Sequence, residues 1–214
     1  MREAGRDPAE VTTIVVTKFH PASLVRELAA LGVRDVGENR QQEASEKSAE
    51  LSDLDLRWHF IGQLQSKKTR SVLAFATAIH SLDRPSLVTA LGAALAPDPR
   101  NQPRGEIDAF IQVNLSDDTG RGGVNPADLE KFAESVVATD GIRLRGLMAV
   151  APLESDARAA FARVRALSER LRAVAPDATA LSMGMSGDYR EAVLEGATHL
   201  RIGTAITGNR PAAG

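Results

Sequence analysis

The 214-residue sequence contains no cysteine, which excludes disulfide bridges, thiolate nucleophiles and cysteine-ligated zinc. Because this composition fits a reducing compartment, we expect a cytoplasmic protein. Charge of one sign is also lacking: 26 basic against 28 acidic residues give no electrostatic basis for binding nucleic acid or an anionic membrane. No apolar run approaches the roughly 20 residues of a membrane span. The polar start, MREAGRDPAE, lacks the apolar core of a signal peptide.

Short apolar segments instead alternate with amphipathic ones along the whole chain. In one amphipathic segment, for example, Leu24, Leu28 and Leu31 share a helical face. Eight strands alternating with seven helices predict parallel βαβ units in one domain, residues 1–214, and a closed (β/α)₈ barrel. An open doubly wound sheet is the alternative, but the turn TKFHP has no glycine fingerprint. The strand candidates are residues 12–18, 35–39, 57–62, 78–82, 108–114, 143–150, 178–184 and 199–206.

The pattern yields one helix fewer than a barrel needs, with nothing helical expected after Ile206. An eighth helix, covering the seam between the last and first strands, would have to come from the N-terminus. Only about ten residues precede the first strand, and GRDP resembles the tail of a helix and its turn. We therefore expect that the covering N-terminal helix is truncated by a downstream start, or that a partner covers the seam.

The segment TTIVVTKFHP presents an amine, Lys18, at the end of an apolar strand. In a barrel the C-terminal ends of the strands build the site, and the eighth strand neighbours the first. Lys18 and Arg201 are therefore expected in the same mouth. The other strand ends bring Asn39, Gly62, Ser81, Asn114 and Met148 to this mouth.

Two further turns at this end of the barrel favour an anion site. SMGMSGD, residues 182–188, places glycines and a serine ahead of a helix expected to begin near Tyr189, and Gly203 and Thr204 follow the eighth strand. Backbone N–H groups at such turns bind phosphate, and barrels often bind it after strands seven and eight. The alternative is that Asp188 only caps the helix and the glycines only turn the chain. With the second turn alongside, phosphate binding is favoured.

A lysine facing a phosphate site suggests a Schiff base with a phosphorylated aldehyde. The amine must be partly neutral to attack a carbonyl, and desolvation or a nearby cation such as Arg201 favours the neutral form. The alternative is a solvated lysine that marks the end of the strand.

The motifs VVTKFHP, GENRQQE, WHFIGQLQSKK, IHSLD, GLMAVAP and LSMGMSGDYREAVLEGATHLRIGTAITG occur in this order. In them the chain resembles the pyridoxal 5'-phosphate (PLP) homeostasis proteins, relatives of the N-terminal barrel of alanine racemase, from about residue 6 to 210. The resemblance implies that Lys18 holds PLP as an internal aldimine and that Arg201 faces the pyridine nitrogen. It implies that Ser186, Gly203 and Thr204 hold the phosphate. Asn39 and Met183 match family residues that line the cofactor.

The sequence departs from the family pattern at Phe19, Gln41, Lys67 and Thr207. A small polar residue, a tyrosine, an asparagine and a phenylalanine, respectively, are more usual there. The family's leading helix is also missing. The lysine and phosphate positions are unchanged, so the departures put only the pocket rim and the packing near strand eight in doubt.

Three functions compete. Racemisation needs a second acid–base group opposite the lysine; in alanine racemase a tyrosine of a second domain supplies it, whereas Tyr189, the only tyrosine here, follows the phosphate loop. A lysine aldolase would need an acid partner near Lys18. The third function, favoured here, is a PLP-binding protein that stores PLP or delivers it to PLP-dependent apo-enzymes. The resemblance implies the same role, in vitamin B6 and amino-acid balance, without an established catalytic reaction. We expect a monomer.

The four histidines, His20, His59, His80 and His199, have neither an i, i+4 pair nor cysteine partners, so no metal site is expected. His80, Ser81 and Asp83 are sequence neighbours, which is poor geometry for a hydrolytic triad. Lys67, Lys68 and Arg70 are interpreted as a solvated helix start, with a second anionic-cofactor site as the alternative hypothesis.

Overall fold

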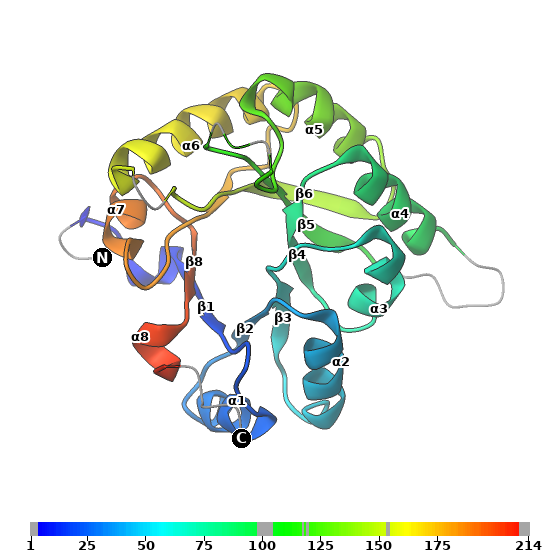
Figure 1. Ribbon diagram of the computed structural model, residues 1–214, viewed down its shortest axis with the longest axis vertical. Coiled ribbons are helices and arrows are strands. Elements are labelled where there is room, and N and C mark those ends of the chain that lie inside the picture. Colours follow the sequence, from blue (N-terminus) through cyan, green and yellow to red (C-terminus); the bar gives the residue numbers. More distant parts are fainter. Residues whose placement is uncertain (1–3, 98–104, 117, 119, 153–154, 210–214) are drawn as a thin grey trace.

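The computed structural model describes residues 4–97, 105–116, 118, 120–152 and 155–209. Eight parallel strands close into a barrel in chain order, as predicted (Figure 1). Each strand pairs with the next, and β8 returns to β1 through a parallel ladder from Thr12–His199 to Val15–Ile202. The strands are β1 (Thr12–Val16), β2 (Asp35–Glu38), β3 (Arg57–Phe60), β4 (Ala78–Leu82), β5 (Ile107–Gln112), β6 (Ile142–Met148), β7 (Ala180–Ser182) and β8 (His199–Ile202).

Helices surround the strands (Figure 1). Their apolar faces pack on the barrel: α6, for example, buries Phe161, Val164 and Leu171. None of the helices in the described ranges is long and apolar enough to cross a membrane. The helices are α1 (Ala22–Ala30), α2 (Gln41–Glu50), α3 (Thr69–Leu73), α4 (Pro85–Leu95), α5 (Leu129–Val137), α6 (Ala157–Arg172), α7 (Tyr189–Leu194) and α8 (Thr204–Thr207), with short 3₁₀ turns η2 (Pro8–Glu10), η3 (Ser66–Lys68) and η4 (Pro126–Asp128).

The prediction for the end of the barrel was wrong in one respect. Residues 199–206 were expected as one strand, but β8 ends at Ile202 and a one-turn helix, α8, begins at Thr204. Gly203, with φ -109° and ψ -95°, takes the chain out of the extended conformation. The longer strand had been expected because the segment 199–206 is rich in apolar residues.

The seam between β8 and β1 carries an open groove on its outer face. This seam groove has a volume of about 500 Å³. Its lining residues come from the outward faces of β1 and β8, from α7 and from α8: Thr13, Leu200, Ile202, Tyr189, Arg190, Val193, Leu194 and Ala205, together with Ala4. The 3₁₀ turn η2 directly precedes β1.

Strand alternation separates two environments. Outward residues such as Leu200 and Ile202 belong to the main apolar core, beneath the helices. The interior contains a small apolar cluster, Phe110, Met148 and Ala180, and a row of buried polar side chains. Because burying an unpaired polar group is costly, the partners of these side chains determine whether the interior is stable.

Candidate functional site

A cavity of about 430 Å³ opens at the C-terminal ends of the strands. We call it the mouth pocket. It brings together Lys18, Asn39, Ser186, Arg201, Gly203 and Thr204, which are six of the seven site residues expected from the sequence. The remaining wall consists of Val16, Phe19, His20, Ile61, Met148, Val150, Met185, Gly187, Thr207 and Gly208. The closeness of Lys18 and Arg201, on which the sequence interpretation depended, is therefore present in the structure.

Met183 is the exception. Its side chain is fully buried in the main apolar core and is not on the wall of the mouth pocket. The reason is strand phase: Ser182 bonds to groups inside the barrel, so the next side chain faces outward. Met185, two residues further, lines the pocket instead.

The conformation of the turn that carries Lys18 is fixed at the next residue, Phe19. Phe19 has φ +69°, which is uncommon for a residue with a side chain, and its backbone N–H donates to Glu43 Oε1. The ring of Phe19 lies 4.9 Å from the Arg40 guanidinium and 6.0 Å from the Lys18 amine. The half-buried Lys18 is thus attached to a backbone conformation that α2 helps to fix.

Beneath this turn lies a buried charged network that the sequence analysis missed. The amine of Lys47 donates to Glu38 Oε1 at 2.7 Å, to Glu43 Oε1 at 2.6 Å and to the carbonyl oxygen of Thr17 at 2.8 Å. The Thr17 hydroxyl also donates to Glu38 Oε1, at 2.7 Å. Burial raises the pKa of Glu38, although Lys47 opposes this shift. A detectable signal was the i, i+4 spacing of Glu43 and Lys47 on α2.

Arg201 approaches the mouth pocket from inside the barrel and is 5% exposed. Its Nη1 donates to the carbonyl oxygen and the hydroxyl of Ser182, at 2.6 and 2.8 Å, and its Nη2 donates to the carbonyl oxygen of Ala149 at 2.9 Å. Burial lowers the pKa of Arg201 to about 10, so it remains a cation at neutral pH. Of its five N–H donors, one on Nη2 and the one on Nε meet no acceptor within the described part of the chain.

The turns after β7 and β8 meet beside Arg201. The Ser186 hydroxyl accepts from the backbone N–H of Ala205 at 3.3 Å, which links the two turns. Across residues 4–209, apart from the undescribed gaps, the backbone N–H groups of Ser186, Gly187 and Thr204 donate no hydrogen bond. These donors at the wall of the pocket are suited to an anion.

Asp188 does not act as the alternative interpretation supposed. It occupies the N-cap position of α7, but its side chain makes no capping hydrogen bond to that helix. Its Oδ1 instead accepts from the backbone N–H of Met185 at 2.6 Å. Asp188 therefore closes the turn that carries Ser186.

Asn39 presents another polar group without a partner. Asn39 lines the mouth pocket, and its Oδ1 is buried and has no hydrogen-bond partner among the described residues. The neighbouring turn after β3 must contain a glycine, because a Cβ on Gly62 would lie 2.1 Å from the carbonyl oxygen of Asn39. Because Asn39 lines the pocket, its Oδ1 is an acceptor to which a ligand bound there can donate.

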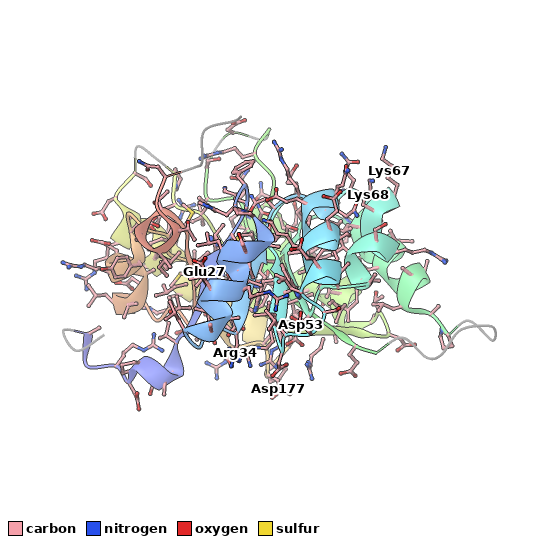
Figure 2. The ribbon with its side chains drawn as sticks, turned by 90° about the horizontal axis from the view of Figure 1, so that it is seen from below. Glu27, Arg34, Asp53, Lys67, Lys68 and Asp177 are labelled. Carbon is pink, nitrogen blue, oxygen red and sulfur yellow. The ribbon has the colours of Figure 1, made fainter. Side chains whose placement is uncertain are left out.

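The remaining candidates lie away from this pocket. Lys67 and Lys68 are exposed in η3 and do not line it; Figure 2 shows them at the end of the barrel opposite Asp177. Tyr189 lines the seam groove. His80 bonds to Ser182 and His59 rather than to Ser81 or Asp83. Among the described residues no cluster of histidine and carboxylate side chains could hold a metal ion.

The closed parallel barrel places the protein in the class of (β/α)₈ barrels, and the lysine, the arginine and the two turns around its mouth form a candidate site for a small anionic ligand. The alanine racemase N-terminal domain model matches residues 3–211. A PLP homeostasis protein of Pseudomonas aeruginosa is 43% identical over 97% of this chain and 88% of its own. One from Escherichia coli is 37% identical over 96% and 88%. The chain therefore belongs to the family of pyridoxal phosphate homeostasis proteins.

Solved structures agree with this assignment. PipY of Synechococcus elongatus, solved without PLP, is 39% identical, covers 97% of both chains and superposes with a TM-score of 0.86. The same protein with PLP bound gives 0.85. Alanine racemase from Corynebacterium glutamicum, 15% identical with a TM-score of 0.76, covers all of this chain and 59% of its own, and supports the fold alone.

Proposed function

We propose that this protein binds PLP in the mouth pocket, with Lys18 as the covalent attachment point, and acts in the homeostasis and supply of PLP. The observation that carries the proposal is the meeting of the Lys18 amine with Arg201, Asn39 and the unpaired N–H groups of two turns in one cavity of about 430 Å³. Relatives named for PLP homeostasis support the same role.

Each residue has a role that follows from its chemistry. Lys18 would hold the cofactor covalently, because its amine is the kind of group that can bond to an aldehyde with loss of one water. Ser186, Gly203 and Thr204 form the wall suited to the phosphate, where backbone N–H groups are available. Asn39 Oδ1 accepts from a ligand donor.

Arg201 can only donate a hydrogen bond, so it would hold the pyridine nitrogen in its unprotonated form. When bound, PLP supplies an aldehyde that captures amines and a ring that withdraws electrons, and an unprotonated ring withdraws them weakly. Arg201 therefore favours retention of the cofactor over carbanion chemistry.

A carrier that delivers PLP to apo-enzymes suits this pocket better than a racemase. Racemisation requires a second acid–base group on the opposite face of the substrate. The tyrosine that the sequence could offer, Tyr189, lines the seam groove outside the barrel. We further infer that the protein works in the cytoplasm, which its lack of cysteine supports.

The test begins with the visible absorbance of protein incubated with PLP. Borohydride reduction followed by peptide mass mapping should locate the added mass on Lys18. The Lys18→Ala variant should stay colourless, whereas Lys67→Ala, which removes an exposed lysine elsewhere on the same end, should stay yellow. Added mass on another lysine would refute the assignment.

A second measurement separates carrier from enzyme. Loaded protein mixed with a PLP-dependent apo-enzyme should restore that enzyme's activity, and protein alone should not racemise alanine. Sustained racemisation that disappears in Lys18→Ala would favour the alternative.

A further inference from the structure

Five buried side chains form a continuous hydrogen-bonded row through the barrel. We call this row the interior chain. Asp35 Oδ1 lies 2.9 Å from His59 Nε2, His59 Nδ1 lies 2.9 Å from His80 Nε2, and His80 Nδ1 lies 2.8 Å from Ser182 Oγ. The Arg201 Nη1 donor completes the row at 2.8 Å from the same Oγ. None of the five residues is more than 8% exposed.

The interior chain connects the two ends of the barrel. Asp35 is the first residue of β2 and pairs with the exposed Arg57 at the N-terminal end of β3. His59, His80 and Ser182 come from β3, β4 and β7, and Arg201 reaches the mouth pocket from β8. The interior chain therefore joins five strands behind a residue that lines the proposed cofactor site.

The direction of the hydrogen bonds follows from the two end groups. Arg201 can only donate, and an ionised Asp35 can only accept. Burial alone would raise the pKa of Asp35, but hydrogen bonds from His59 and Arg57 outweigh it and lower that pKa. Within the described residues the Ser182 hydroxyl has one acceptor for its own proton, His80 Nδ1. Each link of the row has one donor and one acceptor when both imidazoles carry their proton on Nε2. Arg201 then donates to Ser182, Ser182 to His80, His80 to His59, and His59 to Asp35.

A reversed arrangement leaves a group unsatisfied. If His59 donated from Nδ1, His80 would accept at Nε2 and donate from Nδ1 to Ser182. The Ser182 oxygen would then accept from both His80 and Arg201, and its proton would have no acceptor in the described structure. Buried hydroxyl protons without an acceptor are costly, so the forward direction is preferred.

We propose that Ser182, His80 and His59 are positioning residues for Arg201. Together with the carbonyl oxygens of Ser182 and Ala149, they fix three of its N–H donors inside the barrel and leave two for the ligand. This inference rests on the proposed function for the identity of that ligand, but the interior chain itself is a property of the cofactor-free protein.

The first experiment examines the free protein. Nitrogen-15 NMR of the histidine side chains should show His80 and His59 with a proton on Nε2 and none on Nδ1 at neutral pH. Assignment uses the His80→Phe and His59→Phe spectra. A His80 resonance with its proton on Nδ1 would overturn the inferred direction, whether or not PLP binds.

The second experiment measures PLP affinity by absorbance titration. Ser182→Ala removes the hydrogen bond between the Ser182 hydroxyl and the charged Arg201, which should weaken binding about tenfold. His80→Phe leaves the Ser182 hydroxyl without the acceptor for its proton and should weaken binding in the same direction. Ser182→Thr, which keeps a hydroxyl, should recover most of that loss. His199→Phe is the matched control, because the ring of His199 lies against those of His80 and Phe110 but its Nδ1 bonds to Thr198. The substitution keeps an aromatic ring there and removes no hydrogen bond of the interior chain, so less than about a twofold change is expected.

The outcomes separate this inference from the proposed function. If wild-type protein binds PLP and Ser182→Ala, folded by circular dichroism, binds it equally well, the positioning role is refuted and the function stands. If wild-type protein takes up no PLP, the proposed function fails, while the NMR tautomers still decide the direction of the interior chain.

Discussion

The inside of the barrel and its mouth use the same kinds of polar side chain in opposite ways. In the interior chain each side chain bonds to the next, from Asp35 to Arg201. In the mouth pocket, Asn39 Oδ1 and the backbone N–H groups of Ser186 and Thr204 have no partner in the described structure. Arg201 belongs to both regions. Three of its N–H donors bond to Ser182 and Ala149 inside the barrel, and the other two have no acceptor in the described structure. The difference teaches that the polar groups inside the barrel are used up in bonds to one another, whereas those gathered at the mouth pocket remain available to the proposed ligand.

The largest expected effect comes from breaking a pair. Lys47→Met leaves the fully buried Glu38 carboxylate without its cation, which should reduce the free energy of unfolding by about 3–5 kcal/mol. Urea denaturation measures this. The matched control is Arg26→Met, which breaks the exposed pair with Asp53 and should change stability far less.

A companion variant tests the reason for that loss. Glu38→Gln combined with Lys47→Met removes both charges and should recover part of the stability. A single Lys47→Met variant as stable as wild type would show that the interior tolerates unpaired charge, and the comparison between the two regions would fail.

The second-largest effect is expected from acid, which should lower the free energy of unfolding through the buried histidines His80 and His199. Burial lowers the pKa of His199 from 6.5 to about 4, and burial lowers that of His80 well below its usual value. The unfolded chain therefore takes up these protons from about pH 6.5 downward, while the folded protein resists. Stability should fall as pH falls through this window, by about 1.4 kcal/mol per pH unit for each histidine.

Urea denaturation between pH 7 and pH 4.5 measures the slope. His199→Phe removes one of the two groups, so its slope should be shallower by about 1.4 kcal/mol per unit. An unchanged slope would mean that His199 is protonated in the folded state. It would then not belong to the neutral interior.

Changes in the mouth should affect binding without affecting the fold. Ser186→Ala should weaken PLP binding about fivefold and change the unfolding free energy of the free protein by less than about 0.5 kcal/mol. Absorbance titration and urea denaturation of the same preparation provide both numbers. A large loss of stability without a loss of affinity would reverse the expected roles of the two regions.

The smallest effect is expected outside both regions. The double variant Lys67→Ala/Lys68→Ala should bind PLP within about a factor of two of wild type, because neither side chain lines the mouth pocket. Phosphorus-31 NMR titration would detect a second site on these lysines as a second bound signal that the double variant loses.

Much of the fold could be read from the sequence because its signals are local. Each of the eight strands was expected from a short apolar run, and the closed barrel followed from their alternation with helices. The error at residues 203–206 arose because Ile206 and Thr204 suit strands, whereas Gly203 and the packing at the mouth determine where β8 ends.

The site was predictable where turn chemistry and strand ends carried it, as at Lys18 and Ser186. The site was not predictable where strand phase decides which way a side chain points. Ser182 and Met183 are consecutive residues, yet Ser182 faces the inside of the barrel and Met183 the outside. The interior chain had no local signal at all. Its members lie on five strands far apart in the sequence, and only closure of the barrel brings them together.

The ladder between β1 and β8 has a consequence for synthesis. Lys18 is synthesised early, directly after β1. Arg201 and the turn at Gly203 are made only after the seven preceding strands. If Lys18 and Arg201 hold PLP as proposed, a nascent or proteolytically shortened chain without β8 would carry the Lys18 amine but lack the groups needed to retain the cofactor. Stable retention of the cofactor would thus mark a molecule whose last strand has been made and has found the first.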